Sequence, residues 1–117
     1  MKAFPLYCIL LLLLTSCDQA TIGADVSETY FVRYKGADMP VYARGNTASG
    51  KLILVIHGGP GGDGYVYSQL YFSDQLEKEY GMLYWDQRGQ GASQGQYGGS
   101  QVTIEQMRED LRGLCWG

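Results

Sequence analysis

From about residue 29 onward, short segments rich in apolar residues alternate with short polar or glycine-rich segments. Residues 29–34 are rich in aromatic and β-branched side chains, and the turn-forming sequence Lys35-Gly36-Ala37-Asp38 separates them from a second segment at residues 39–44. This pattern predicts two strands that form a β-hairpin. Pro40 lies near the start of the second strand, which is typical of a strand at the edge of a sheet.

A different pattern begins at residue 51. Leu52 to Ile56 are apolar without interruption, which is typical of a strand covered on both faces, as in parallel sheets between layers of helices. Residues 58–64 then form a glycine-rich loop, and residues 65–80 carry apolar side chains at roughly helical spacing. Gly81 is expected to end this helix in a left-handed conformation.

The second half of the chain repeats the order of strand, loop and helix. Residues 82–85 predict a further buried strand, and residues 86–100 predict a long polar loop rich in glycine. Thr103, with Gln106 three residues later, predicts a capping box that begins a helix reaching Leu111. A hairpin followed by strand, glycine loop, helix, strand, loop and helix predicts an α/β fold.

The first 16 residues have the pattern of an export signal. Lys2 provides a positive start, Leu6 to Leu14 is an apolar run, and Thr15-Ser16-Cys17 follows. The run is much shorter than the roughly 20 residues that span a bilayer, and it fits a secretory signal peptide. The ending resembles the bacterial lipobox, which implies lipidation of Cys17, with residues 17–28 as a tether. A signal peptide with a cysteine at this position by chance is the alternative.

This leader also predicts where the protein is found. A lipid on Cys17 would hold the exported chain on a bacterial cell membrane, at its periplasmic or extracellular face. Of the three cysteines, Cys8 lies in the signal and Cys17 is the expected lipidation site. Cys115 is then left without a partner for a disulfide bond.

The charge of the chain argues against one class of partner. Nine basic and twelve acidic side chains give a formal net charge of −3. The sequence contains no basic patch with interleaved aromatic residues, so nucleic-acid binding is not expected.

Two glycine-rich motifs carry the candidate chemistry. His57-Gly58-Gly59-Pro60-Gly61-Gly62 follows the first apolar strand, and Asp86-Gln87-Arg88-Gly89-Gln90-Gly91-Ala92-Ser93 follows the next. Glycines at 58 and 59 let a substrate carbonyl approach main-chain N–H groups, which stabilise a developing negative charge. The two motifs in this order resemble those of the proline iminopeptidase group of α/β-hydrolases. Residues 103–111 also resemble the helix that precedes the nucleophile strand of that family.

The resemblance covers about residues 30–111 and implies the N-terminal half of an α/β-hydrolase sheet, with residues 29–117 as a truncated domain. In that fold the strand at 51–57 lies between the strand at 82–85 and the nucleophile strand, so here it would form a sheet edge. Gly58 and Gly59 would supply N–H groups of the oxyanion hole. Loop-structuring roles fall to His57, Pro60, Gly61, Asp86, Arg88 and Gly89, with an Asp86–Arg88 ion pair as one way of bracing the loop.

The catalytic serine, acid and histidine are not expected in this chain. No Gly-x-Ser-x-Gly sequence occurs, and the single histidine already belongs to the first motif. Residues 113–117 read Gly-Leu-Cys-Trp-Gly, with Cys115 in the place of a nucleophile. A nucleophile elbow requires a strand before its turn and a helix after it, whereas a helix is expected to run almost directly into this segment. We therefore expect no activity from the chain alone.

The function that follows from the resemblance is that of a serine hydrolase of peptide bonds. The parent protein would remove an N-terminal residue, often proline, from short peptides. Its expected partners are a short peptide or another small acyl substrate, and the membrane that holds the lipid anchor. No cofactor and no metal ion are expected.

Two other functions remain open. Residues 59–64 fit G-x-G-x-x-G between a strand and a helix, and Asp86 ends the next strand about 20 residues later, as in a dinucleotide-binding domain. His57, the second glycine loop and the export signal argue against this function, because nicotinamide cofactors are chiefly intracellular. The second alternative is a non-catalytic surface lipoprotein.

Overall fold

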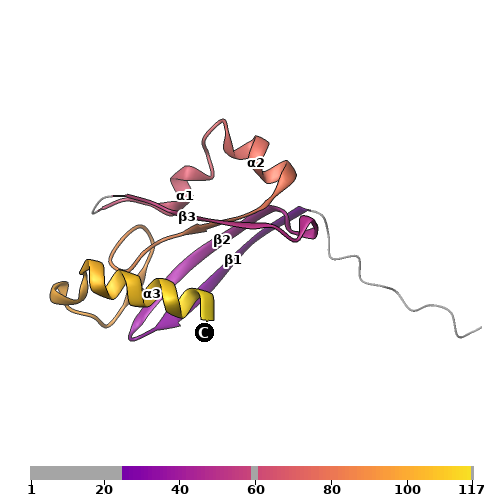
Figure 1. Cartoon of the computed structure of the whole chain (residues 1–117). Coiled ribbons are helices and arrows are strands. Elements are labelled where there is room, and N and C mark those ends of the chain that lie inside the picture. The colour runs from indigo at the N-terminus through magenta and orange to yellow at the C-terminus, as the bar shows by residue number, and fades with distance from the viewer. Residues whose placement is uncertain (1–24, 59–60, 117) are drawn as a thin grey trace, which may run out of the picture.

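A computed structural model describes residues 25–58 and 61–116. Within these ranges the chain forms a five-stranded mixed sheet with helices on both of its faces (Figure 1). The predicted α/β fold is therefore confirmed. The predicted signal peptide, Cys17, Gly59 and Pro60 lie outside the described residues.

The N-terminal hairpin is present, and it is longer than the sequence predicted. Strands β1 (Asp25–Tyr34) and β2 (Ala37–Asn46) pair antiparallel along their whole length. Lys35 and Gly36 form the turn, with positive φ angles of 42° and 78°, a conformation that matches the twist of a two-residue hairpin. The predicted tether at 17–28 ends too late, because residues 25–28 already pair with residues 43–46.

Strand β2 lies inside the sheet, so the prediction of an edge position from Pro40 was wrong. The strand order is β1-β2-β4-β3, and β4 (Gly81–Trp85) pairs antiparallel with β2. The last β2–β4 pair is Val41 with Trp85, and just beyond it the Asp86 N–H donates to the Pro40 carbonyl at 3.0 Å. Proline is tolerated there because the ladder with β4 ends before the missing N–H is needed.

Strand β3 (Leu52–Ile56) pairs parallel with β4 and has no strand on its other side among the described residues. The prediction that this strand forms a sheet edge is confirmed. The prediction that it is covered on both faces was wrong, since Leu52 is 61% exposed and Ile56 is 52% exposed. The described helices leave both ends of this apolar strand open to solvent.

The segment between β3 and β4 forms two short helices instead of the single helix predicted at 65–80. Helix α1 spans Gly64–Tyr67 and helix α2 spans Ser73–Glu79. The Ser68 hydroxyl donates to the Tyr65 carbonyl and the Ser73 hydroxyl to the Tyr67 carbonyl. Such side-chain bonds compete with the helical ladder and favour a break.

Gly81 has a different role from the predicted helix stop. It is the first residue of β4, and Tyr80, in an extended conformation, ends α2. A Cβ atom on Gly81 would come within 2.5 Å of the Leu52 side chain. Glycine avoids this contact where Gly81 lies beside Leu52 in the parallel ladder, so its role is close approach between neighbouring strands rather than a left-handed turn.

The polar segment after β4 contains two short elements that the sequence did not predict. Strand β5 (Gln94–Gly95) pairs with the start of β2, and a 3-10 helix, η3, spans Gly99–Gln101. Another 3-10 helix, η2 (Thr47–Ser49), connects β2 to β3.

Helix α3 (Ile104–Trp116) is longer than predicted at its C-terminal end. The Thr103 hydroxyl accepts a hydrogen bond from the Gln106 N–H at 3.1 Å, so the predicted N-cap is confirmed. The second half of the capping box is absent, because the Gln106 side chain donates to Asp110 instead. Cys115 lies exposed within this helix, in a backbone that does not match the strand-and-turn geometry of a nucleophile elbow.

Successive side chains of the central strands face opposite sides of the sheet. On one side the core contains Ala37, Met39, Val41 and Trp85, and Leu111 and Leu114 of α3 pack against it. On the other side Tyr42 contacts Tyr65 of α1 edge to face, and Tyr84 donates a hydrogen bond to Glu77 of α2. The helices thus cover both faces of β2 and β4 (Figure 1).

Candidate functional site

The two glycine-rich loops predicted as the site lie at the same end of the sheet. One begins at His57 after β3 and the other at Asp86 after β4. Because these two strands are parallel, their carboxyl ends lie at the same end of the sheet. Binding sites of α/β sheets commonly lie there. The structure therefore brings together two motifs that are separated in the sequence by α1, α2 and β4.

Gln90 of the second loop makes the most direct contact with the first. Its side-chain oxygen accepts hydrogen bonds from the Gly61 N–H at 2.6 Å and from the Gly62 N–H at 3.0 Å. The Gly91 N–H in turn donates to the Gly62 carbonyl at 3.0 Å. Three hydrogen bonds thus fix the far end of the first glycine loop to the second.

Gln87 holds the near end of the first loop. Its side-chain amide donates to the His57 carbonyl at 2.6 Å, and its N–H makes a weak 3.5 Å hydrogen bond to Nε2 of His57. His57 is only 4% exposed, and Nδ1 has no hydrogen-bond partner among the described residues. A Cβ atom at Gly62 would lie 2.4 Å from this Nδ1, so the ring fills the inside of the loop.

Asp86 holds the start of α1 through hydrogen bonds. Its buried carboxylate accepts hydrogen bonds from the Gly64 N–H at 2.7 Å, the Ala92 N–H at 2.8 Å and the Tyr42 hydroxyl at 3.2 Å. Burial, together with the negative charge of Asp86, raises the pKa of Tyr42 to about 12. One carboxylate therefore joins the start of α1, the second loop and β2 through charge-assisted hydrogen bonds.

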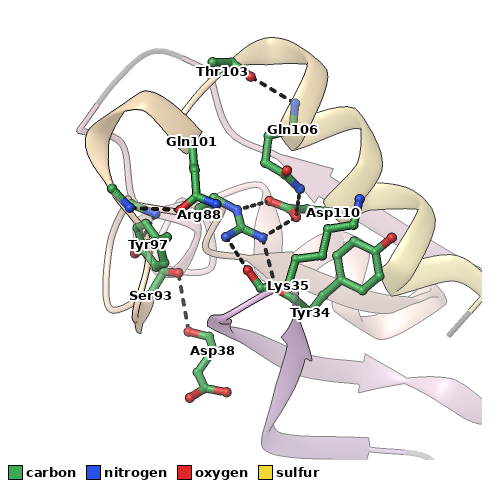
Figure 2. A network of polar contacts seen from close by, with 12 residues as sticks. Tyr34, Lys35, Asp38, Arg88, Ser93, Tyr97, Gln101, Thr103, Gln106 and Asp110 are labelled. Carbon is green, nitrogen blue, oxygen red and sulfur yellow. Dashed lines mark hydrogen bonds and ion pairs between the residues drawn. The ribbon is translucent and has the colours of Figure 1, made fainter.

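Arg88 pairs with Asp110 of α3, and not with Asp86 as the sequence suggested (Figure 2). Two hydrogen bonds of 2.8 and 2.7 Å join the guanidinium to the carboxylate, and both side chains are fully buried. The guanidinium also donates to the carbonyls of Tyr34 and Lys35, each at 3.0 Å. The hydrogen bonds to Asp110 raise the pKa of Arg88. One side chain thereby connects the hairpin turn, the second loop and α3.

Tyr97 completes this network on the loop side. Its ring stacks against the Arg88 guanidinium at 5.2 Å, and its hydroxyl accepts a hydrogen bond from the Gly89 N–H at 3.0 Å. Gly89 has a φ angle of +70°, and a Cβ atom there would lie 3.0 Å from Val102. Glycine is therefore required at this turn.

Gly58 is the predicted oxyanion-hole residue that the structure describes. It is exposed, and a Cβ atom built on it would meet no heavy atom within 4 Å. The side of Gly58 on which a side chain would project is therefore open, while Gln87 bonds to His57 before it and Gln90 to Gly61 after it. Gly61 has a φ angle of +82°, which only glycine adopts readily.

Several residues that hold the site were not singled out from the sequence. Gln87 and Gln90 lie inside the second motif, and their polar side chains between glycines were the available signal. Asp110 and Tyr97 had no such signal, because their importance depends on a contact with Arg88 across the fold.

The described residues contain no group of three or more His, Cys, Asp or Glu side chains that could hold a metal ion. In the same part of the chain, no helix is long and apolar enough to cross a membrane.

The geometry argues against dinucleotide binding by the first loop. The N–H groups of Gly61 and Gly62, which a pyrophosphate would need, already donate to Gln90. Asp86, the residue expected to bind a ribose hydroxyl, is fully buried and bonded to the protein itself.

Comparison with solved structures finds a similar fold in the crystal structure of a proline iminopeptidase-related protein from Thermus thermophilus. The match has a TM-score of 0.65 and 31% sequence identity, and it covers 77% of this chain. This likeness supports a relationship to the α/β-hydrolases. The chain spans only 31% of the length of that neighbour. No protein-family model matches the chain, and no curated protein does.

Proposed function

We propose that this chain is the N-terminal portion of an exported serine hydrolase, an aminopeptidase of the proline iminopeptidase type. In this proposal the chain supplies the loop that stabilises the oxyanion, and the remainder of the parent protein supplies the serine, the acid and the histidine. The observation that carries the proposal is the first glycine loop, which is fixed by Gln87 and Gln90 while Gly58 stays exposed.

The chemistry of acyl transfer explains why such a loop is needed. When serine attacks a peptide carbonyl, the carbonyl oxygen becomes negatively charged in the tetrahedral intermediate. Main-chain N–H groups that are already oriented toward this oxygen stabilise the charge without rearranging during the reaction. Gly58 and Gly59 carry no side chain that would obstruct the approach of the substrate.

His57 does not act as the general base in this proposal. Its ring is buried under the loop, with Nδ1 against Gly62 and Nε2 toward the Gln87 N–H. A general base must come within hydrogen-bond reach of the attacking hydroxyl. His57 is the only histidine in the 117 residues, so the catalytic histidine must come from elsewhere in the parent protein.

The test is the activity of the protein translated from the complete reading frame of the source gene. We expect a Gly-x-Ser-x-Gly sequence after a further strand, hydrolysis of proline arylamides, and loss of hydrolysis when its serine is replaced by alanine. Residues 17–117 alone should show neither turnover nor labelling by a fluorophosphonate probe. A reading frame without such a serine, or a full-length protein that hydrolyses neither peptides nor esters, would instead favour a non-catalytic surface lipoprotein.

A further inference from the structure

Gln90 occupies an unusual position between the two loops. Its side chain is almost completely buried, and one oxygen accepts hydrogen bonds from two successive N–H groups, those of Gly61 and Gly62. Both partners are donors, so the atom that faces them must be the oxygen and not the amide nitrogen. The Gln90 amide therefore has one orientation in which both N–H groups find an acceptor.

The two N–H groups form a small concave pair of donors. Successive main-chain N–H groups around a left-handed residue, here Gly61 at φ +82°, bind anions and carbonyl oxygens. Without Gln90, these two N–H groups would be free to bind a substrate carbonyl oxygen or an oxyanion, which is the same group that an oxyanion hole binds. With Gln90 in place, both donors are engaged inside the protein.

The contacts of Gln90 differ from those of its neighbours in the second loop. Asp86 bonds to the start of α1, Gln87 bonds to His57, and Arg88 bonds to α3 and the hairpin turn. Within the residues that the structure describes, Gln90 is the side chain that accepts hydrogen bonds from the Gly61 and Gly62 N–H groups. One amide oxygen therefore engages both donors, and the hydrogen bond from the Gly91 N–H to the Gly62 carbonyl is a further contact to this part of the loop.

We propose that Gln90 is a positioning residue of the oxyanion-stabilising loop. Its oxygen holds the Gly61–Gly62 N–H pair away from the substrate, so that the exposed main chain at Gly58 is the part of the loop that a substrate oxygen meets. This inference rests on the proposed hydrolase function for its purpose, but the contact and its effect on the loop do not require catalysis.

The test is residue-resolved amide hydrogen exchange on the full chain at micromolar concentration. Gln90→Leu removes the acceptor and keeps most of the bulk, whereas Gln90→Glu keeps an acceptor oxygen in either protonation state. Gln101→Leu is the matched control, because the Gln101 side-chain oxygen accepts a hydrogen bond from the Gly98 N–H at 2.9 Å in an unrelated turn. Amides of β2 and β4 report whether each variant is folded.

We expect Gln90→Leu to speed exchange at Gly61 and Gly62 by about tenfold or more without changing β2 or β4. Gln90→Glu should retain the protection, and Gln101→Leu should affect Gly98 but not the first loop. The proposal is overturned if Gln90→Leu leaves Gly61 and Gly62 unchanged, if Gln90→Glu exchanges as fast as the leucine variant, or if protection is lost across β2 and β4 as well. Because no step measures hydrolysis, failure here is distinct from failure of the proposed function.

Discussion

Four polar side chains within five positions of the second loop are buried: Asp86, Gln87, Arg88 and Gln90. Burying such groups is costly unless each finds hydrogen-bond partners. Asp86, Gln87 and Gln90 bond to the main chain of the first loop or the start of α1. Arg88 bonds to α3 and to the hairpin turn. At the scale of single residues, the second loop acts as the scaffold on which the first is shaped.

The Arg88–Asp110 pair should be the most sensitive of these contacts. Asp110→Ala would leave the Arg88 guanidinium buried without a neutralising charge, so we expect the free energy of unfolding to fall by about 3–5 kcal/mol. Arg112→Ala is the control, since it breaks the ion pair of an exposed arginine with Glu109 and should cost at most about 1 kcal/mol. Urea unfolding of the two variants measures both changes. Equal losses would contradict the role given to the buried pair.

Two tyrosines with raised pKa values predict a loss of stability at high pH. Burial, with Asp86 nearby, raises the pKa of Tyr42 to about 12. Burial and the hydrogen bond to Glu77 likewise raise the pKa of Tyr84 to about 12, against an opposing contribution from Ser73. The folded state favours both neutral phenols, so their contribution to stability is complete below about pH 10, the pKa of tyrosine in an unfolded chain, and is lost as the pH rises toward 12.

Tyrosinate absorbance during an alkaline titration measures this effect. The native protein should show a late step near pH 12, accompanied by unfolding, and Tyr42→Phe should reduce its amplitude. A titration in which every tyrosine ionises close to its ordinary pKa of about 10 while the protein stays folded would contradict the burial described for Tyr42 and Tyr84.

Among the secondary-structure elements, β3 combines two properties that rarely occur together in a stable sheet. Its residues Leu52 to Ile56 are all apolar, and its outer side has no strand partner within the described residues. Free N–H and C=O groups along an uncharged edge are a template for pairing with another chain. The same strand leads directly into the first glycine loop, so whatever pairs with β3 also lies next to the candidate site.

A charge on this edge should therefore reduce self-association. Leu52 is 61% exposed, so Leu52→Lys places an ammonium group in water at little cost to the fold and disfavours edge-to-edge pairing. Ile104→Lys is the control, because Ile104 is 81% exposed but lies on α3. Light scattering against protein concentration should fall for Leu52→Lys and not for Ile104→Lys. Equal behaviour of the two variants would show that β3 is not the associating element.

Secondary-structure elements could be predicted from the sequence more accurately than the contacts between distant side chains. The hairpin, β3, β4 and the start of α3 follow from local patterns of apolar residues and from Thr103 as an N-cap. The break between α1 and α2 was missed because it depends on serine hydroxyls that bond to nearby carbonyls. Asp110 could not be recognised as the partner of Arg88, since α3 carries several acidic residues and only packing against the hairpin decides which one is buried.

Over the whole molecule, the described residues provide a fixed main-chain loop but no exposed histidine. The only histidine is buried beneath that loop, and the chain spans 31% of the length of the similar Thermus protein. Under the proposed function, this chain supplies the part of a hydrolytic site that binds the oxyanion, and the rest of the parent protein supplies the reacting groups.

Attachment to a membrane is a separate prediction of the whole chain. Expressed in a bacterial host, the protein should incorporate labelled fatty acid and partition into the detergent phase, because Leu14-Thr15-Ser16-Cys17 resembles a lipobox. Cys17→Ser should abolish both properties. Cys115→Ser is the control, since Cys115 is exposed on α3 and should not affect labelling. Labelling that persists in Cys17→Ser would exclude lipidation at that residue.

The most direct test of the central claim compares two glycines in the protein translated from the complete reading frame. Neither Gly58 nor Gly99 has a positive φ angle, and a Cβ atom on either would meet no atom within 4 Å, so alanine at either position should leave the melting temperature unchanged. If Gly58 lies where the substrate carbonyl approaches, Gly58→Ala should lower kcat/KM for a proline arylamide by roughly tenfold or more, and Gly99→Ala should not. Full activity of a folded Gly58→Ala variant would contradict the assignment of this loop to the oxyanion.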